Sequence, residues 1–131
     1  MGCDIHMFLE RKVNNKWVMV NEIDNSLTDR DYSFFSDLAG VRGEGPKPKG
    51  LPDDISDSVK LNSEDYGSDG HSHSFYLIKE IIPIILNHKI ERDYQKENPE
   101  EAFFEIYEDR CTCCDQVIPT QEHRVVFWFD N

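Results

Sequence analysis

The first segment of the chain alternates between apolar and polar side chains. Apolar residues occupy every second position from Cys3 to Leu9, and mostly polar residues lie between them. This period of two predicts a β-strand over residues 3–11 with one face in a core. The turn-like sequence Asn14-Asn15-Lys16 follows, and residues 17–20 predict a second strand that completes an antiparallel hairpin.

The end of the chain is its other strongly apolar block. Residues 124–129 are rich in Val, Phe and Trp, which predicts a closing strand beside the first one in the middle of a sheet. Helical patterns lie between these terminal strands, and Ser33 is a candidate N-cap for the first of them. The predicted helices are residues 34–40, 56–61 (a single turn), 75–88 (kinked or split at Pro83) and 99–107.

The remaining segments are rich in polar residues, proline or glycine. They predict loops over residues 25–31 and 62–74, and an ordered connector or lid over residues 43–54. The whole chain, residues 1–131, is therefore expected to be a single α+β domain. Its fold would be a small, mainly antiparallel sheet, the N-terminal hairpin plus the C-terminal strand, with two or three helices packed on one face.

Charge narrows the range of partners. The chain has 26 acidic and 14 basic residues, a net charge of −12, which argues against general nucleic-acid binding and against an anionic membrane surface. A small anion held by a few donors, or a divalent cation, remains compatible with this charge. No signal-peptide pattern is visible and the apolar run from Ile81 to Leu86 is too short to span a bilayer, so we expect a cytoplasmic protein.

The four cysteines are expected to be reduced in that compartment. Cys3 is predicted to be a small buried residue of the first strand. Cys111, Cys113 and Cys114, with His123 downstream, lack a second Cys-x-x-Cys pair, and thiols are favoured there over a zinc site.

Two short motifs carry candidate chemistry. Asp4-x-His6 would place a carboxylate and an imidazole on the same strand face. The two could bind a metal or act as an acid–base pair, or they could simply be part of a solvated strand surface. His71-x-His73 would do the same for two imidazoles in an extended segment. Ser72 and Ser74 could donate to an anion; alternatively, one of them caps the next helix and the histidines are loop surface.

The two motifs would make one site if the histidine segment folds back onto the first strand. Asp4, His6, His71 and His73 would then supply ligands for Zn²⁺, Mn²⁺ or Fe²⁺, with Asp69 and Asp130 as further ligands or as residues that orient an imidazole. Arg30, Tyr32 and Arg42 form a third group. The two guanidinium groups suit a phosphate or carboxylate, although salt bridges with nearby acidic residues are the alternative.

Several blocks, taken together, resemble an uncharacterised family of small proteins encoded by tailed bacteriophages and their bacterial hosts. They are Met1–His6 (MGCDIH), Arg30–Tyr32, Leu38–Arg42, Gly50–Ser56, Asp69–Ser74 (DGHSHS) and Val125–Asn131 (VVFWFDN). The resemblance implies a phage accessory protein in the cytoplasm of the infected bacterium. Small phage proteins of this sort often counter host defence, which makes a nucleotide-like defence signal a candidate ligand.

Three functions are consistent with these residues. The first is a binder of a small anionic, nucleotide-like ligand, and the second is a metal-dependent phosphoester hydrolase that uses the same pocket. The third is a module that docks on a host protein. No P-loop, G-x-G-x-x-G, G-x-S-x-G or H-E-x-x-H motif is present, so the sequence assigns no enzyme class and no oligomeric state.

Overall fold

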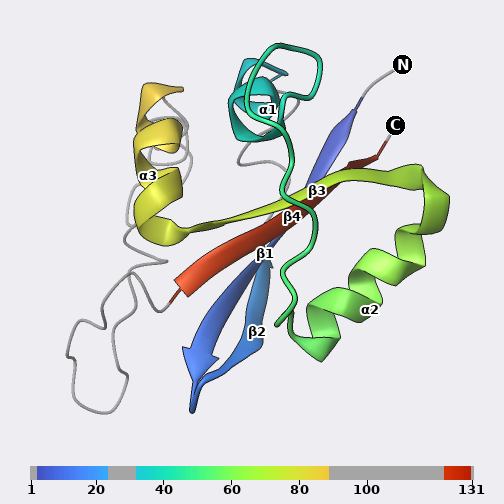
Figure 1. Ribbon diagram of the computed structural model, residues 1–131, viewed down its shortest axis with the longest axis vertical. Coiled ribbons are helices and arrows are strands. Elements are labelled where there is room, and N and C mark those ends of the chain that lie inside the picture. Colours follow the sequence, from blue (N-terminus) through green and yellow to red (C-terminus); the bar gives the residue numbers. More distant parts are fainter. Residues whose placement is uncertain (1–2, 24–31, 89–122, 131) are drawn as a thin grey trace.

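The computed structural model describes residues 3–23, 32–88 and 123–130. These residues form a four-stranded antiparallel sheet in the order β2-β1-β4-β3, with helices packed against it (Figure 1). The predicted α+β class is confirmed. The elements are β1 (Asp4–Val13), β2 (Lys16–Ile23), α1 (Tyr32–Ala39), α2 (Asp57–Tyr66), the 3-10 turn η2 (Gly67–Asp69), β3 (Gly70–Leu77), α3 (Ile78–Asn87) and β4 (His123–Asp130).

The predicted hairpin is formed by β1 and β2. Asn14 and Asn15 at its tip have left-handed backbones, with φ angles of 52° and 65°. A two-residue type I′ turn requires this conformation at both central positions, and Asn adopts it more readily than most residues. The strands extend beyond the predicted limits on both sides of this turn.

Strand β4 lies between β1 and β3, which confirms its expected place beside β1 in the middle of the sheet. Seven of its eight residues are buried. Because successive side chains of a strand point to opposite faces, β4 supplies apolar groups to both sides of the sheet.

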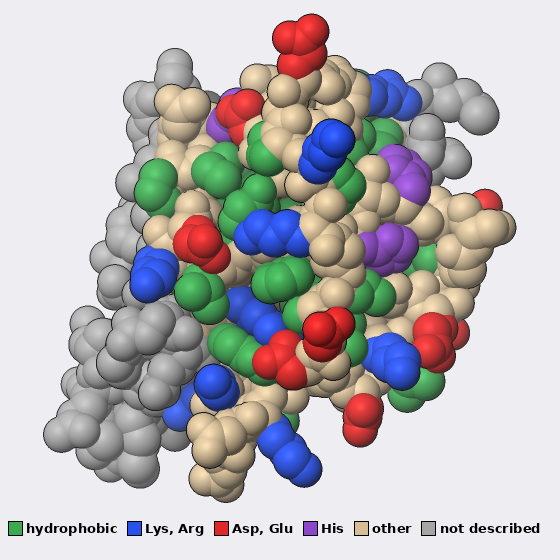
Figure 2. Space-filling view, in the orientation of Figure 1, with side chains coloured by type: hydrophobic (Ala, Val, Ile, Leu, Met, Phe, Trp, Pro, Cys, Tyr) green, Lys and Arg blue, Asp and Glu red, His purple; other side chains and the backbone are tan. Residues whose placement is uncertain are grey.

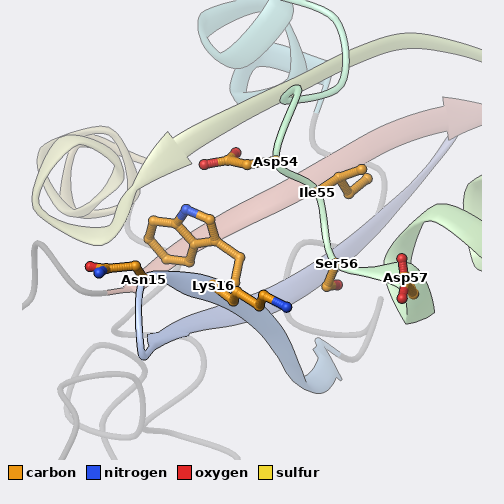
Figure 3. Close-up of a pocket in the computed structure, with 7 residues that line it drawn as sticks. Asn15, Lys16, Asp54, Ile55, Ser56 and Asp57 are labelled. Atoms are coloured by element: carbon orange, nitrogen blue, oxygen red, sulfur yellow. The ribbon is translucent and has the colours of Figure 1, made fainter.

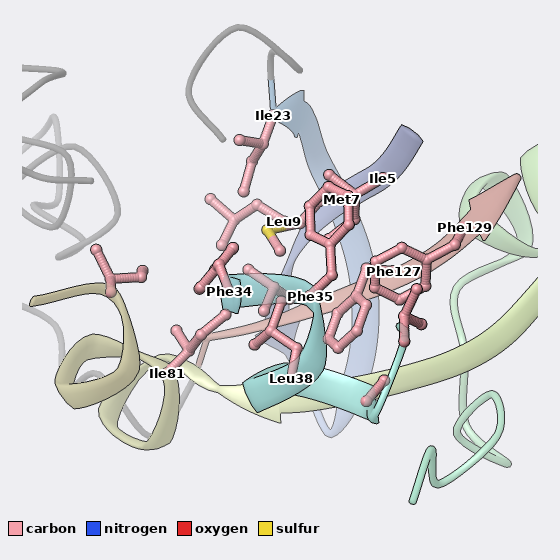
Figure 4. Packing of buried hydrophobic residues seen from close by; sticks show 14 of the residues in the cluster. Ile5, Met7, Leu9, Ile23, Phe34, Phe35, Leu38, Ile81, Phe127 and Phe129 are labelled. Atoms are coloured by element: carbon pink, nitrogen blue, oxygen red, sulfur yellow. The ribbon is translucent and has the colours of Figure 1, made fainter. Parts of the chain in front are cut away.

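One face of the sheet packs on α1 and α3. The alternating residues Ile5, Met7 and Leu9 of β1 meet Phe127 and Phe129 of β4 in this core, and the two helices cover them (Figure 4). The helix residues that complete the cluster are Phe34, Phe35, Leu38, Ala39, Ile78, Ile81 and Ile85.

The opposite face has a smaller core under α2. Phe8, Val126 and Trp128 pack there against Val59, the one buried apolar residue of α2. The helices therefore cover both faces, and the prediction of helices on one face only is wrong. The reason is the composition of β4, whose two sets of alternating side chains are both apolar.

The proline- and glycine-rich connector, residues 40–56, leads from α1 to α2 and crosses β3 on the way (Figure 1). The Gly50 amide donates to the His73 carbonyl (2.7 Å), and the Lys49 amide donates to the Ser74 hydroxyl (3.1 Å). Lys49 Nζ also donates to the Phe75 carbonyl (2.8 Å). The connector is thus ordered against β3, as one of the two sequence interpretations proposed.

The loop predicted over residues 62–74 is wrong. The helical turn predicted at residues 56–61 is a ten-residue helix that continues to Tyr66, and β3 begins only four residues later, at Gly70. Ser56 caps α2 by accepting a hydrogen bond from the Val59 amide (3.4 Å).

The flanking helix boundaries also differ from the predicted ones. Residues 75–77 belong to β3, and α3 begins at Ile78 and is continuous across Pro83, so two abutting helices are ruled out. Ser33 lies inside α1 rather than at its N-cap. The predicted helix at 99–107, the cysteine segment 111–114 and the loop at 25–31 lie outside the described residues.

Within the described ranges, the helices are all too short or too polar to cross a bilayer.

Candidate functional site

Three strand ends meet at one end of the sheet: β1 and β3 begin there and β4 ends there. Across these strands Asp4 is paired with Asp130, which is paired in turn with Gly70. The start of β1 and the end of β4 lie side by side at this place (Figure 1). Side chains more than sixty residues apart in sequence are therefore neighbours, and the first strand and the histidine segment do reach one region, with β4 between them.

The two histidines of the His-x-His motif lie on opposite faces of the sheet. His71 stacks on Phe129 (centroids 6.2 Å apart), on the α1 face, whereas His73 stacks on Trp128 (5.9 Å), on the α2 face. The pairing register shifts between His71 and Ser74, and Ser72 has a φ of +55°. This bulge adds one residue to the alternation, so the expectation that both imidazoles share one face is wrong.

His6 is a largely enclosed polar side chain at this end, with 9% of its surface exposed. A hydrogen bond of 3.0 Å joins its Nδ1 to the Tyr66 hydroxyl, with the donor set by the imidazole tautomer. Its Nε2 lies 3.1 Å from Oδ2 of Asp130, an ion-pair distance whose angle does not make a hydrogen bond. Asp130 thus lies beside the imidazole; whether it is a further ligand or a residue that orients the imidazole stays a prediction.

Trp128 is the centre of an aromatic cluster. Its ring lies 5.1 Å from Phe8, 5.8 Å from Tyr66 and 6.5 Å from His6. The indole is fully buried, and its Nε1 has no hydrogen-bond partner among the residues that the structure describes. A buried donor of this kind is uncommon in folded proteins and calls for an explanation.

Gly70 keeps this cluster compact. A Cβ at this position would lie 3.2 Å from Cβ of Tyr66, 3.5 Å from Nε2 of His73 and 3.5 Å from Cδ1 of Trp128. The absence of a side chain at Gly70 therefore lets the three rings approach the start of β3. We call the set Asp4, His6, Tyr66, Gly70, His73, Trp128 and Asp130 the histidine end.

Burial and charge set the protonation of two groups here. Desolvation by burial lowers the pKa of His73, and the neighbouring His71 lowers it further. Desolvation raises the pKa of the Tyr66 hydroxyl, and the negative charge of Asp130 adds to this. At neutral pH both groups are therefore uncharged and can still make hydrogen bonds. Histidine side chains are visible on the surface between the connector and α2 (Figure 2).

The other predicted contact residues lie around this end without joining the cluster. Ser72 Oγ is 3.0 Å from His71 Nδ1, while Ser74 is fully buried and accepts a hydrogen bond from the Lys49 amide. Ser74 therefore does not face a ligand. Tyr32 lies on the α1 side, where its hydroxyl accepts a hydrogen bond from the buried Cys3 amide (3.3 Å).

Arg42 stacks on the Tyr32 ring, with 4.5 Å between the guanidinium carbon and the ring centroid. This contact places the arginine near the start of β1 but on the opposite face from His6. Arg30 lies outside the described residues. An anion subsite made by both arginines therefore stays a prediction.

The predicted metal ligands do not assemble into one coordination shell. His6 and His73 lie on strands that are separated by β4, about 10 Å apart at the backbone. In the described part of the chain, no group of three or more His, Cys, Asp or Glu side chains is arranged to hold a metal ion. Zinc, manganese or iron therefore stays a prediction without a supporting ligand set.

Three residues of the histidine end were not predicted: Tyr66, Gly70 as a packing position, and Trp128. Tyr66 lies in the segment that was predicted to be a loop, and nothing in the sequence indicated that it contacts His6. Trp128 was assigned to the closing strand, and its place two residues before Asp130 was the available clue.

No protein-family model, curated protein or solved structure matches the chain.

Proposed function

We propose that the histidine end binds a small anionic, nucleotide-like ligand and that the protein is a binder rather than a hydrolase. The observation that carries the proposal is the row His6–Trp128–His73, which crosses three strands and is bordered by Tyr66 and Asp130. It concentrates hydrogen-bonding side chains in a half-buried place at the edge of a rigid sheet. Such convergent polar groups on a pre-formed scaffold are typical of ligand sites.

The arrangement of donors and acceptors suits a ligand that carries both kinds of group. His73 on β3, which stacks on Trp128, offers a donor to an anionic oxygen. Asp4 and Asp130, paired across β1 and β4, offer acceptors to hydroxyl or amino groups. A nucleotide has phosphate oxygens at one end and ribose hydroxyls and base amino groups at the other.

The chemistry of the individual groups favours binding over catalysis. Both nitrogens of His6 face groups of the protein: Nδ1 is hydrogen-bonded with Tyr66, and Nε2 lies at ion-pair distance from Asp130. The raised pKa of Tyr66 keeps its hydroxyl protonated, which suits a donor and not a nucleophile. Water activation by a bound metal would need a ligand set that the described side chains do not supply.

The biological setting comes from the resemblance alone. Proteins with the blocks MGCDIH, DGHSHS and VVFWFDN belong to tailed phages and their hosts, where sequestering a nucleotide signal would counter host defence. In this proposal the ligand is such a signal in the cytoplasm of the infected bacterium.

The test is calorimetric titration with cyclic dinucleotides, nucleoside mono-, di- and triphosphates, and inorganic phosphate as separate probes. We expect at least one nucleotide to bind, and His73→Gln to weaken it about tenfold, the value of one lost charge-assisted or buried hydrogen bond. His88→Gln is the matched control, because His88 lies at the end of α3 and contacts Asp37 of α1.

Each alternative has its own signature. Chromatography of the incubated nucleotide that shows product, with activity lost on chelation, would replace the binder by the metal-dependent hydrolase. Capture of one stoichiometric host protein together with no nucleotide binding would replace it by the host-protein module. Equal weakening by the His73 and His88 variants would remove the histidine end from the site.

A further inference from the structure

A separate pocket lies at the opposite end of the α2-covered face. It has a volume of about 310 Å³ and opens between the tip of the β1–β2 hairpin and the segment that leads into α2 (Figure 3). Its lining residues are Asn15, Lys16, Trp17, Asp54, Ile55, Ser56 and Asp57. None of them belongs to the histidine end, so the two sites share no residue.

A network around Arg124 holds two of the lining residues, Asp54 and Trp17. Nε of Arg124 donates to Oε1 of the fully buried Glu10 (2.6 Å), and its NH1 donates to Oδ1 of Asp54 (2.8 Å). The guanidinium also stacks on the Trp17 ring at 4.1 Å. The side chain of Arg124 is only 5% exposed, so the network holds Asp54 and Trp17 in fixed positions.

The pocket carries a permanent excess of negative charge. The hydrogen bond from Arg124 lowers the pKa of Asp54, which keeps this carboxylate ionised at neutral pH. Among the residues that line the pocket, Asp54 and Asp57 outnumber the one cation, Lys16, by one charge. The Asp54 side chain is 65% exposed and so remains accessible to a ligand.

The start of α2 does not turn this pocket into a site for anions. An uncapped helix N-terminus attracts anions, but Ser56 caps this one and Asp57 in the first turn offsets its dipole. Trp17 and Ile55, both half-buried, add apolar surface beside the carboxylates. The walls thus combine fixed negative charge with a place for a small apolar group.

We propose that this pocket binds a small organic cation: an ammonium or guanidinium group carried on a short apolar body. The cationic group lies between Asp54 and Asp57, and the apolar body packs on Trp17 and Ile55. A volume of about 310 Å³ is at the lower end of ligand pockets, which limits the ligand to about the size of an amino acid or a biogenic amine. The net charge of −12 adds a long-range attraction for cations.

Lys16 gives the proposal a distinctive signature. Its amino group points toward the side of the pocket that Ser56 and Asp57 form (Figure 3). It therefore competes with a ligand cation for Asp57. Removing the lysine charge should strengthen the binding of a cation, whereas the same change would weaken the binding of an anion held by Lys16.

The experiment is an NMR titration of the ¹⁵N-labelled protein with 2-phenylethylammonium, with 2-phenylethanol and 3-phenylpropionate as neutral and anionic analogues. We expect saturable amide shifts at residues 15–17 and 54–57 for the ammonium compound alone. Asp57→Asn should weaken its binding about tenfold, as expected for a lost charge-assisted contact, and Lys16→Met should strengthen it.

Asp53→Asn is the matched control, because Asp53 is an exposed neighbour that does not line the pocket. The proposal is overturned if the alcohol binds as well as the amine, if Asp53→Asn weakens binding as much as Asp57→Asn, or if Lys16→Met weakens binding. His73→Gln should leave this titration unchanged, so its result is independent of the nucleotide proposal.

Discussion

The two ends of the α2-covered face treat buried polar groups in opposite ways. We call the end made by Glu10, Trp17, Asp54, Ser56 and Arg124 the arginine end. There both oxygens of Glu10 accept hydrogen bonds, one from Arg124 and one from the Ser56 amide (2.8 Å). At the histidine end, Trp128 Nε1 is buried without a hydrogen-bond partner among the described residues, and His6 Nε2 has an ion-pair contact with Asp130 but no hydrogen bond.

The two ends therefore differ in how their buried polar groups contribute to stability. A fully bonded buried network specifies one arrangement, and here it fastens β1, β4, the connector and the start of α2 to one another. A buried donor without a partner costs about 1–3 kcal/mol, and such costs are concentrated at functional sites. The bonded network of the arginine end therefore stabilises the fold, whereas the histidine end retains a buried donor without a partner among the described residues.

The largest expected effect is at the arginine end. Glu10→Ala leaves the buried Arg124 without its closest partner and the Ser56 amide without an acceptor, and should reduce the free energy of unfolding by about 3–5 kcal/mol. Urea denaturation measures this loss.

Two further variants make the interpretation specific. Glu64→Ala, an exposed glutamate on α2, should change stability by less than about 0.5 kcal/mol. The double variant Glu10→Leu with Arg124→Met removes both charges and should recover most of the loss. A double variant as unstable as Glu10→Ala would mean that the ion pair itself, and not the uncompensated charge, accounts for the effect.

At the histidine end, a smaller loss is expected from Trp128→Phe. The change removes buried apolar surface but also removes the Nε1 donor that has no partner among the described residues, so the two effects partly cancel. Urea denaturation should show a loss of about 1–2 kcal/mol. A loss as large as that of Glu10→Ala would show that the indole N–H is as well satisfied as the groups around Arg124.

Much of this comparison could be predicted from the sequence, because β1 and β4 are strongly patterned. The alternation from Cys3 to Glu10 correctly assigns each side chain to its face, and the Asn14–Asn15 pair correctly indicates the turn. The apolar run 125–129 correctly indicates a central strand. Asp4 and His6 were therefore assigned to one face of the first strand by local rules alone, whereas Asp130 was only a candidate neighbour.

The rest depends on tertiary contacts that leave little local signal. Strand β3 begins with Gly-His-Ser-His-Ser, which lacks apolar alternation, and it is a strand because β4 pairs with it. The bulge at Ser72 that separates His71 from His73 has no marker such as glycine. Glu10 and Arg124 are 114 residues apart, so their ion pair could not be inferred from spacing.

The smallest expected effect is on the pH dependence of the free energy of unfolding. The two ends should lose stability in different pH ranges. The pKa of His73 is lowered from 6.5, so the unfolded chain binds more protons at this residue; its stabilising contribution is complete above pH 6.5 and falls on acidification below it. The pKa of Asp54 is lowered from 3.8 by its hydrogen bond with Arg124, so its contribution is lost only in a more acidic range.

Urea midpoints measured from pH 8 to pH 3 should therefore show two separable components. His73→Gln should flatten the plot of urea midpoint against pH just below pH 6.5. Asp54→Asn should flatten it near and below pH 3.8, and its effect should be less than about 1 kcal/mol because the exposed Asp54 carboxylate is screened by solvent. His88→Gln and Asp53→Asn should leave the respective differences in place. If His73→Gln altered only the acidic limb, His73 would not be desolvated in the folded protein, and the contrast between a bonded arginine end and an under-bonded histidine end would lose its electrostatic support.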